Sequence, residues 1–206
     1  MPPSPTPTTT PAETGFDPLV FWIQYRSQIL LLSGLFAIAL TAFALSEYVR
    51  QRTNTSAQQL FGAANTADAY RKVIAEYSGT VPAGNAHLML AEKLRQEGKL
   101  EESTATLRAF AEKYPKHQLV SGAWTSIAAN LEAQGKVDEA LSTYQKVSTA
   151  YANTFSAPAA LMAQARLLEA KGKTEEARRI YEQVMTQFQE NAAAQQAAQE
   201  LRRLKK

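Results

Sequence analysis

Residues 124–144 read WTSIAANLEAQGKVDEALSTY, and this stretch decides the fold. Apolar and small side chains recur at roughly every third or fourth position up to Leu131, a spacing typical of one face of a helix. Gly135 then interrupts the pattern, and a helix end often needs the left-handed backbone that glycine tolerates. Helical spacing resumes from Ala140 to Tyr144. The stretch therefore predicts two helices joined by a glycine turn.

This turn repeats at a fixed interval, because Gly98-Lys99, Gly135-Lys136 and Gly172-Lys173 lie 37 residues apart. The same step aligns further residues into columns. The aligned columns are Ala91, Ala128 and Ala165; Leu94, Leu131 and Leu168; Glu102, Glu139 and Glu176; Ser103, Ala140 and Ala177; Tyr70, Leu107, Tyr144 and Tyr181; Val73, Phe110, Val147 and Val184; and Tyr77, Tyr114, Tyr151 and Phe188. A single helix pair cannot bury its own apolar side, so successive pairs must stack into a solenoid.

The columns over residues 57–190 resemble the tetratricopeptide repeat (TPR). The third repeat matches the TPR pattern best, through Trp124, Ile127, Ala128, Leu131, Gly135, Ala140 and Tyr144. The fourth repeat departs from it at Gln164, where a leucine is expected. The resemblance implies an all-α fold with about 3.5–4 helical hairpins and a C-terminal capping helix, although the period is longer than the usual 34 residues.

An uncharged, strongly apolar segment precedes the repeats. Residues 29–45 read ILLLSGLFAIALTAFAL, and the uncharged gap between Arg26 and Glu47 would span about 30 Å as a helix, which matches a bilayer core. Trp22, Tyr25 and Tyr48 flank it as an aromatic belt would. We predict a transmembrane helix over residues 29–46. Its lipid-facing residues are predicted to include Ile29, Leu32, Leu35, Phe36, Ile38, Leu40, Phe43 and Leu45.

Two questions about this segment stay open in the sequence. A cleaved signal peptide is the rival reading, since Ala42-Phe43-Ala44 resembles a cleavage site, but the region before the apolar run is long and weakly basic. The orientation is also open, because Arg26 and the amino terminus on one side nearly balance Arg50 and Arg52 on the other.

The chain accordingly divides into five expected segments. Residues 1–18 form a Pro/Thr-rich tail, which cannot bury enough apolar surface to order itself. Residues 19–28 form an interfacial segment, 29–46 the transmembrane helix, 47–190 the TPR domain, and 191–206 the capping helix.

Composition argues against an enzyme and against nucleic-acid binding. The chain has no Cys, and its two His, His87 and His117, are far apart, so neither a metal site nor a cofactor is expected. Paired carboxylates such as Asp138-Glu139 recur at the start of each second helix, where the helix dipole favours them. The net charge of +3 comes from the residues flanking the apolar segment and from the basic C-terminal tip, Arg202 to Lys206. No broad basic face remains for nucleic acid.

The expected partners are therefore other proteins, bound on the concave TPR surface, and the lipid bilayer. The inward positions of the first helices are mostly Ala, Ser, Leu and Met, with Asn130 as the only Asn. This pattern lacks the Lys, Arg and Asn clamp by which some TPR domains bind chaperone C-termini, so cytosolic chaperone docking loses support.

The order of tail, membrane helix and TPR domain resembles the ancillary subunit of the bacterial Sec translocon, the YfgM type. That resemblance implies a single-pass inner-membrane protein whose TPR domain is periplasmic and links the translocon to periplasmic chaperones. Two alternatives remain. One is an envelope-assembly scaffold of the BamD or Tol-Pal coordinator type, which would need cleavage near Ala44. The other is an organelle import receptor with a cytosolic TPR domain.

Overall fold

The computed structural model describes residues 18–204, which form nine α-helices and contain no strand within that range. The helices are α1 (Pro18–Ala63), α2 (Ala67–Glu76), α3 (Val81–Gln96), α4 (Leu100–Lys113), α5 (Val120–Ala133), α6 (Val137–Ala150), α7 (Ala157–Ala170), α8 (Thr174–Gln187) and α9 (Ala192–Leu204). The predicted Pro/Thr-rich tail, except Pro18, and the last two lysines of the basic tip lie outside the described residues. The chain divides into two compact units, Met1–Gln51 and Arg52–Lys206.

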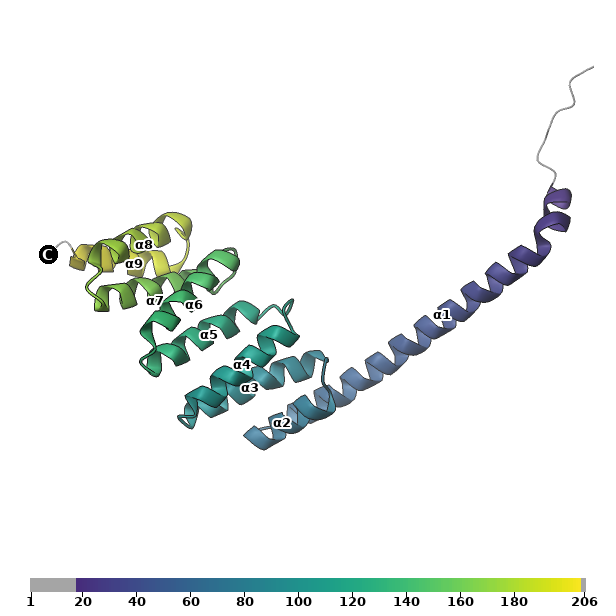
Figure 1. The fold of residues 1–206 in the computed structure, drawn as a ribbon, viewed down its shortest axis with the longest axis horizontal. Helices are drawn as coiled ribbons and strands as arrows, with labels where there is room; N and C mark the ends of the chain where they lie inside the picture. Colours follow the sequence, from purple (N-terminus) through teal and green to yellow (C-terminus); the bar gives the residue numbers. More distant parts are fainter. Residues whose placement is uncertain (1–17, 205–206) are drawn as a thin grey trace, which may run out of the picture. The chain divides into compact units, whose positions relative to one another are not determined.

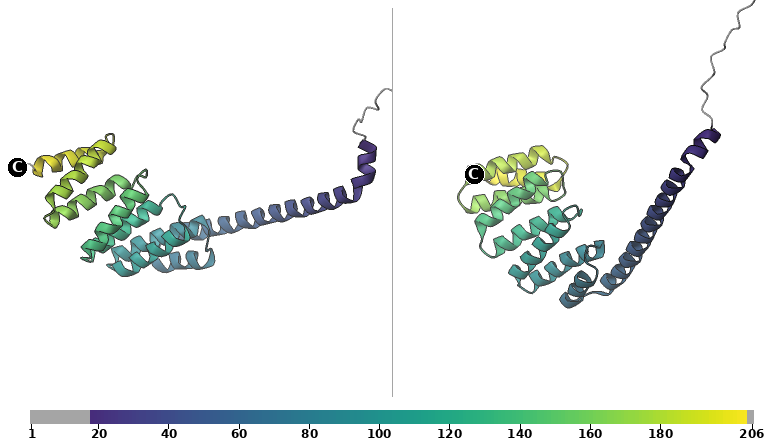
Figure 2. Two further views of the ribbon diagram at one scale, coloured as in Figure 1. Left: turned by 45° about the horizontal axis from the view of Figure 1, so that its top comes forward. Right: turned by 45° about the vertical axis from the view of Figure 1, so that its right-hand side comes forward.

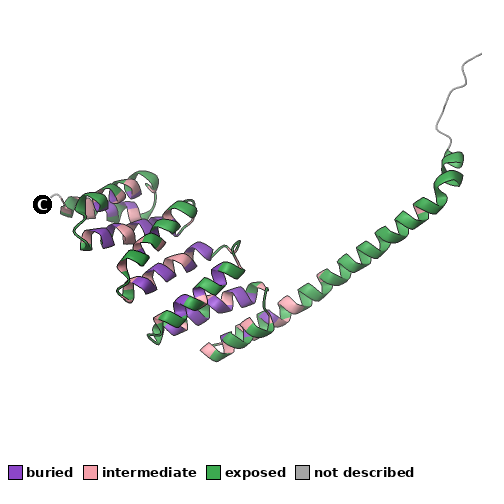
Figure 3. Ribbon diagram, in the orientation of Figure 1, coloured by how far each residue is buried: buried purple, intermediate pink, exposed green. Residues whose placement is uncertain are grey.

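In the first unit, the apolar side chains of α1 are largely exposed. Phe36 and Phe43 are 66% and 69% exposed, and Leu32, Leu35, Ile38, Leu40 and Leu45 are exposed as well (Figure 3). Ile29 is half-buried. The predicted interfacial and transmembrane segments lie on this one helix. Among the described helices, α1 has the length and composition needed to cross a membrane, a criterion that an N-terminal signal sequence also satisfies.

The hydroxyl groups of Thr41 and Ser46 are satisfied inside α1. Thr41 Oγ1 donates to the carbonyl oxygens of Ala37 and Ile38, at 3.0 and 2.9 Å, and Ser46 Oγ donates to that of Phe43 at 2.7 Å. Such bonds to the preceding turn are common for Ser and Thr inside helices. They satisfy these two hydroxyls without water.

In the second unit, successive helices form hairpins that stack in sequence order (Figures 1 and 2). Leu60 and Phe61, near the end of α1, pack on the core cluster that contains Tyr70 and Val73 of α2. Helix α3 pairs with α4, α5 with α6, α7 with α8, and α9 packs on α8. In the first hairpin Ala57 is buried and the ring of Phe61 lies 6.0 Å from that of Tyr70, centroid to centroid. The second unit is thus a TPR-like solenoid.

Each of the three repeated glycines ends a first helix through the same hydrogen-bond pattern. Gly98, Gly135 and Gly172 have φ values of 76°, 75° and 74°. The amide after each glycine donates to the carbonyl of the column leucine, as from Lys136 to Leu131 at 2.9 Å, and the glycine amide donates to the residue after that leucine. This is the Schellman arrangement, and its left-handed residue explains why glycine recurs.

The columns identified in the sequence form the core of the second unit. Val73, Phe110, Val147 and Val184 are completely buried, as are the small residues Ala128, Ala140, Ala165 and Ala177. Ala91, Leu94, Ser103, Leu131, Tyr144, Leu168 and Tyr181 are buried to at least 94%. The small side chains allow the two helices of a hairpin to approach closely, which explains their fixed place in the period.

The column of Tyr77, Tyr114, Tyr151 and Phe188 terminates the second helices. Each is the C-cap of its helix, and each cap amide donates to the carbonyl of the buried column residue four positions earlier. In the last element, α9, Ala194 and Ala197 face the core, and the side chains between them are exposed or half-buried. An exposed polar outer face is what the end of a solenoid requires.

Candidate protein-binding site

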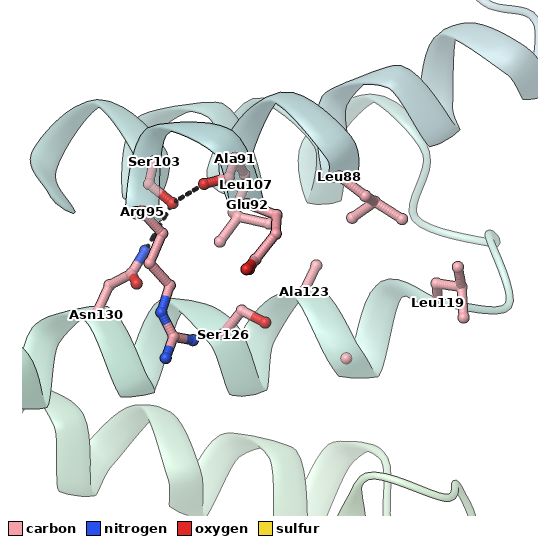
Figure 4. Close-up of a pocket in the computed structure, with 11 residues that line it drawn as sticks. Leu88, Ala91, Glu92, Arg95, Ser103, Leu107, Leu119, Ala123, Ser126 and Asn130 are labelled. Atoms are coloured by element: carbon pink, nitrogen blue, oxygen red, sulfur yellow. Dashed lines mark hydrogen bonds between the residues drawn. The ribbon is translucent and has the colours of Figure 1, made fainter. Parts of the chain in front are cut away.

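The first helices of neighbouring hairpins, α3, α5, α7 and α9, form what we call the first-helix surface. A pocket of about 220 Å³ lies on it between α3 and α5, with side chains of α4 as its floor (Figure 4). One end is apolar, lined by Leu88 and Leu119. The other end is polar and contains Arg95, Ser126 and Asn130. We refer to this as the α3–α5 pocket.

A buried hydrogen-bond chain builds the polar end. Ser103 Oγ donates to the carbonyl oxygen of Ala91 at 2.7 Å, and Asn130 Nδ2 donates to Ser103 Oγ at 2.9 Å. Asn130 is completely buried, yet its Oδ1 has no hydrogen-bond partner within the described chain. A buried acceptor without a donor is costly, on the order of 1–3 kcal/mol, so this oxygen favours a ligand that brings an N–H group.

Two charged side chains extend into the same pocket from α3. The guanidinium of Arg95 reaches toward α5 beside Asn130 and Ser126, and the carboxylate of Glu92 lies nearer the apolar end (Figure 4). Glu92 Oε1 accepts a hydrogen bond from Gln96 Nε2 at 2.9 Å. Arg95, in contrast, makes no side-chain hydrogen bond or ion pair to any of residues 18–204. The pocket therefore presents an unpaired cation at its polar end.

Elsewhere on the first-helix surface Arg166 and Arg203 are paired, in a network that repeats with the 37-residue period. Glu132 on α5 accepts a hydrogen bond from Tyr144 Oη at 3.3 Å and forms an ion pair with Arg166 on α7 at 2.9 Å. Glu169, Tyr181 and Arg203 repeat this arrangement one period later. Burial first, and the nearby carboxylate second, raise the pKa of each tyrosine to about 12.

The α3–α5 pocket interrupts this network. The columns that hold Glu132, Tyr144 and Arg166 contain Arg95, Leu107 and Ala129 one period earlier. Thus the glutamate is replaced by a residue of opposite charge, and the other two partners are absent. Arg95 was not singled out in the sequence, because the charged columns aligned there were that of the turn lysines and that of Glu102, Glu139 and Glu176. The column of Arg95, Glu132 and Glu169, which changes sign at its first member, would have identified the break.

The residues singled out in the sequence for possible chemistry are placed in packing roles. Trp124 is half-buried beside α6, where Lys146 Nζ lies 3.1 Å from its ring centroid in a cation–π contact, and burial lowers the pKa of Lys146. His87 is buried, with Nδ1 2.8 Å from the carbonyl oxygen of Ala83 and its ring 5.7 Å from that of Tyr114. Gln164 lines a shallow groove between α6, α7 and α8.

The paired carboxylates occupy the first turns of α4, α6 and α8. They are exposed, and four of the six form ion pairs, such as Glu102 with Arg71 at 3.6 Å and Asp138 with Lys171. The Lys171 ammonium lowers the pKa of Asp138 through its hydrogen bond. Within residues 18–204, no three His, Asp or Glu side chains gather as metal ligands would.

These features define a helical-repeat protein of the type that binds other proteins. The family model of the tetratricopeptide repeat-like domain matches residues 20–205, and the chain belongs to this family. TPR domains bind protein partners and are typically non-enzymatic scaffolds.

Solved structures with the same fold include two of nearly identical TPR-like repeats from a Podosopora anserina protein described as a kinesin light chain, one of them a single-residue variant. Both are 21% identical to this chain, and each alignment covers 76% of this chain and 82% of theirs, with TM-scores of 0.55 and 0.54. Identity at this level shows the fold alone. No curated protein matches the sequence significantly.

Proposed function

We propose that this protein is a membrane-tethered adaptor that binds partner proteins on its first-helix surface. The observation that carries the proposal is the uncovered apolar length of α1, which no part of the described chain buries. A helix that is apolar on every side is stable in lipid rather than in water. Joined to a family that binds proteins, it would hold a binding surface at a membrane.

The cell envelope is the proposed location, with the TPR domain in the periplasm and the partners being the Sec translocon and periplasmic chaperones. The order of tail, apolar helix and TPR domain supports this, because it is the order found in the ancillary translocon subunits of the YfgM type. The adaptor would keep a chaperone beside the exit of the translocon, so that an emerging chain passes directly to it.

Site-specific photo-crosslinking in native cells tests this function. A photoreactive residue at Ser126, in the α3–α5 pocket, is expected to form adducts with translocon or periplasmic proteins. The same residue at Ala109, an exposed position on α4 outside the pocket, provides the control and should give few adducts. Adducts from Ser126 that contain only cytosolic or organelle precursor proteins would replace the envelope function with that of an import receptor. Equal, unspecific adducts from both positions would reject the adaptor function.

A further inference from the structure

The α3–α5 pocket combines three features that together specify a ligand. It has an unpaired guanidinium on Arg95, a completely buried acceptor on Asn130 without a donor, and an apolar end at Leu88 and Leu119. Its volume of about 220 Å³ lies below the roughly 300–1,000 Å³ of most small-molecule and cofactor sites. It is suited to one or two side chains of a larger partner.

We propose that this pocket binds an extended segment of a partner protein by an acidic side chain, held by Arg95, next to an apolar side chain, held between Leu88 and Leu119. The inference rests on the adaptor function proposed above and specifies what its surface recognises. A guanidinium pairs with a carboxylate through two parallel hydrogen bonds, which gives geometric selectivity as well as attraction.

The buried Asn130 oxygen determines the conformation of the segment. An acceptor in this position requires an N–H donor, and the main-chain amides of an extended peptide are donors that do not depend on its sequence. Since Oδ1 lies at the polar end beside Arg95, the amide that it binds belongs to the acidic residue or to its neighbour. The contact with Asn130 thus aligns the backbone of the segment, while the contact with Arg95 selects its acidic side chain.

Glu92 sets the order of the two side chains. Its carboxylate lies between the polar and the apolar ends, and it would repel a second carboxylate placed there. The acidic group of the ligand must therefore lie at the Arg95 end and the apolar group at the Leu88 end. The repeat period supports a dedicated site. Glu132 and Glu169 in the next two hairpins each pair with an arginine of the following first helix, whereas α3 has Arg95 in their column.

The test selects peptides from a phage-displayed library of random twelve-residue sequences on the full chain in detergent. The displayed peptides have no free C-terminus, so a carboxylate can come only from a side chain. We expect the recovered sequences to carry Asp or Glu within two residues of a large apolar residue. Replacing that acidic residue by its amide should weaken binding, measured by fluorescence anisotropy, at least about tenfold.

Two variants and a matched control locate the contact. Arg95→Glu introduces the residue that the same column holds in α5 and α7, so it should fold, and it should lose the acidic peptides at least about tenfold. Asn130→Leu places the residue found at Leu167 one period later, and it should weaken the same peptides several-fold while helicity stays unchanged. Arg108→Glu makes the same charge change at an exposed site on α4 and should recover the original peptides.

Three outcomes overturn the proposal: no peptide enriched, enrichment without acidic residues, or equal binding of acidic peptides by Arg95→Glu. If peptides bind independently of Arg95, or none binds while crosslinks from Ser126 persist, the acidic recognition is wrong and the adaptor function survives. If no peptide binds and the crosslinks from Ser126 are also absent, both the acidic recognition and the adaptor function are wrong.

Discussion

At the residue scale, His87 shows how the solenoid uses a titratable side chain for packing. Its imidazole lies among Phe110, Tyr114 and the α3 backbone, 6.4 and 5.7 Å from the two rings. Burial is the main reason why its pKa falls below the usual 6.5, and the charge of Lys113 lowers it further, while the hydrogen bond to the Ala83 carbonyl acts in the opposite direction. His87 is therefore expected to be neutral in the folded domain at neutral pH.

This environment predicts a loss of stability in mild acid. Because the pKa is lower in the folded than in the unfolded state, the unfolded chain binds more protons, and stability falls as the pH drops below about 6.5. One such group contributes at most about 1.4 kcal/mol per pH unit. Thermal unfolding between pH 7.5 and 5.5 should show the decline, and His87→Leu, which supplies the residue found at Leu161 in the same column, should reduce it.

His117 provides the control for this experiment. Burial lowers its pKa as well, but it is only half-buried, so His117→Gln should remove a smaller part of the pH dependence. An equal melting temperature at both pH values for the wild-type chain would contradict the prediction.

At the element scale, replacing a turn glycine by alanine should lower the free energy of unfolding through the backbone conformation alone, without a steric contribution. At Gly135 φ is +75°, and an added Cβ would meet no atom within 4 Å. Gly135→Ala should therefore cost only the left-handed backbone energy, about 1–2 kcal/mol, measured by chemical denaturation. Gly62→Ala is the matched control, because this residue lies in α1 without positive φ or near neighbours, and it should be neutral or stabilising by up to about 1 kcal/mol. Equal effects of the two substitutions would exclude this account of the turns.

The elements that the sequence predicted well are those whose residues repeat. The leucine, glycine and small-residue columns determine the hairpins, since each position has one structural requirement that recurs every 37 residues. The α3–α5 pocket was not predicted, because its defining residues, Arg95 and Asn130, depart from the period and belong to different hairpins. Sequence periodicity reveals shared packing, whereas a binding site depends on how one repeat differs from the rest.

The continuity of α1 could be predicted from the sequence. The first helix of the first repeat, near Glu47 to Phe61, is expected to continue the membrane helix. In the structure α1 continues to Ala63, where Leu60 and Phe61 pack in the first hairpin. Since no proline or glycine occurs between Gly34 and Gly62, nothing in the sequence requires a break.

The α3–α5 pocket should close if the Glu–Tyr–Arg network that it interrupts is restored there. Arg95→Glu, Leu107→Tyr and Ala129→Arg together give α3, α4 and α5 the residues that form the Glu132, Tyr144 and Arg166 network one period later. The combined variant should remain folded, with an unchanged or slightly raised melting temperature, and it should bind acidic peptides at least about tenfold more weakly. Full peptide affinity in this variant would show that binding occurs elsewhere, and a large fall in melting temperature would show that the tyrosine does not fit.

At the scale of the whole molecule, the proposed tether joins two units with opposite solvent requirements. The second unit buries its apolar columns and exposes charged faces, so it is stable in water. The apolar part of α1 buries almost nothing and satisfies the hydroxyls of Thr41 and Ser46 within the helix, so it is suited to lipid. This contrast explains why one chain contains both a strongly apolar segment and a balanced, highly charged repeat domain.

Membrane fractionation tests the tether at the same scale. After alkaline carbonate extraction, the wild-type chain should stay with the membranes, whereas Leu35→Arg combined with Ile38→Arg should release it, because each arginine at the centre of a spanning helix costs about 2.5–3.5 kcal/mol. Thr186→Arg with Gln189→Arg adds the same charge to exposed positions of the second unit and should leave the chain in the membrane fraction.

Mass spectrometry of the mature protein should find residues 1–44 attached. A chain that begins after Ala44 would identify a cleaved signal and favour the soluble assembly scaffold. On spheroplasts, added protease should digest the TPR domain if it is periplasmic, and protection of the domain would instead require the cytosolic orientation of an import receptor.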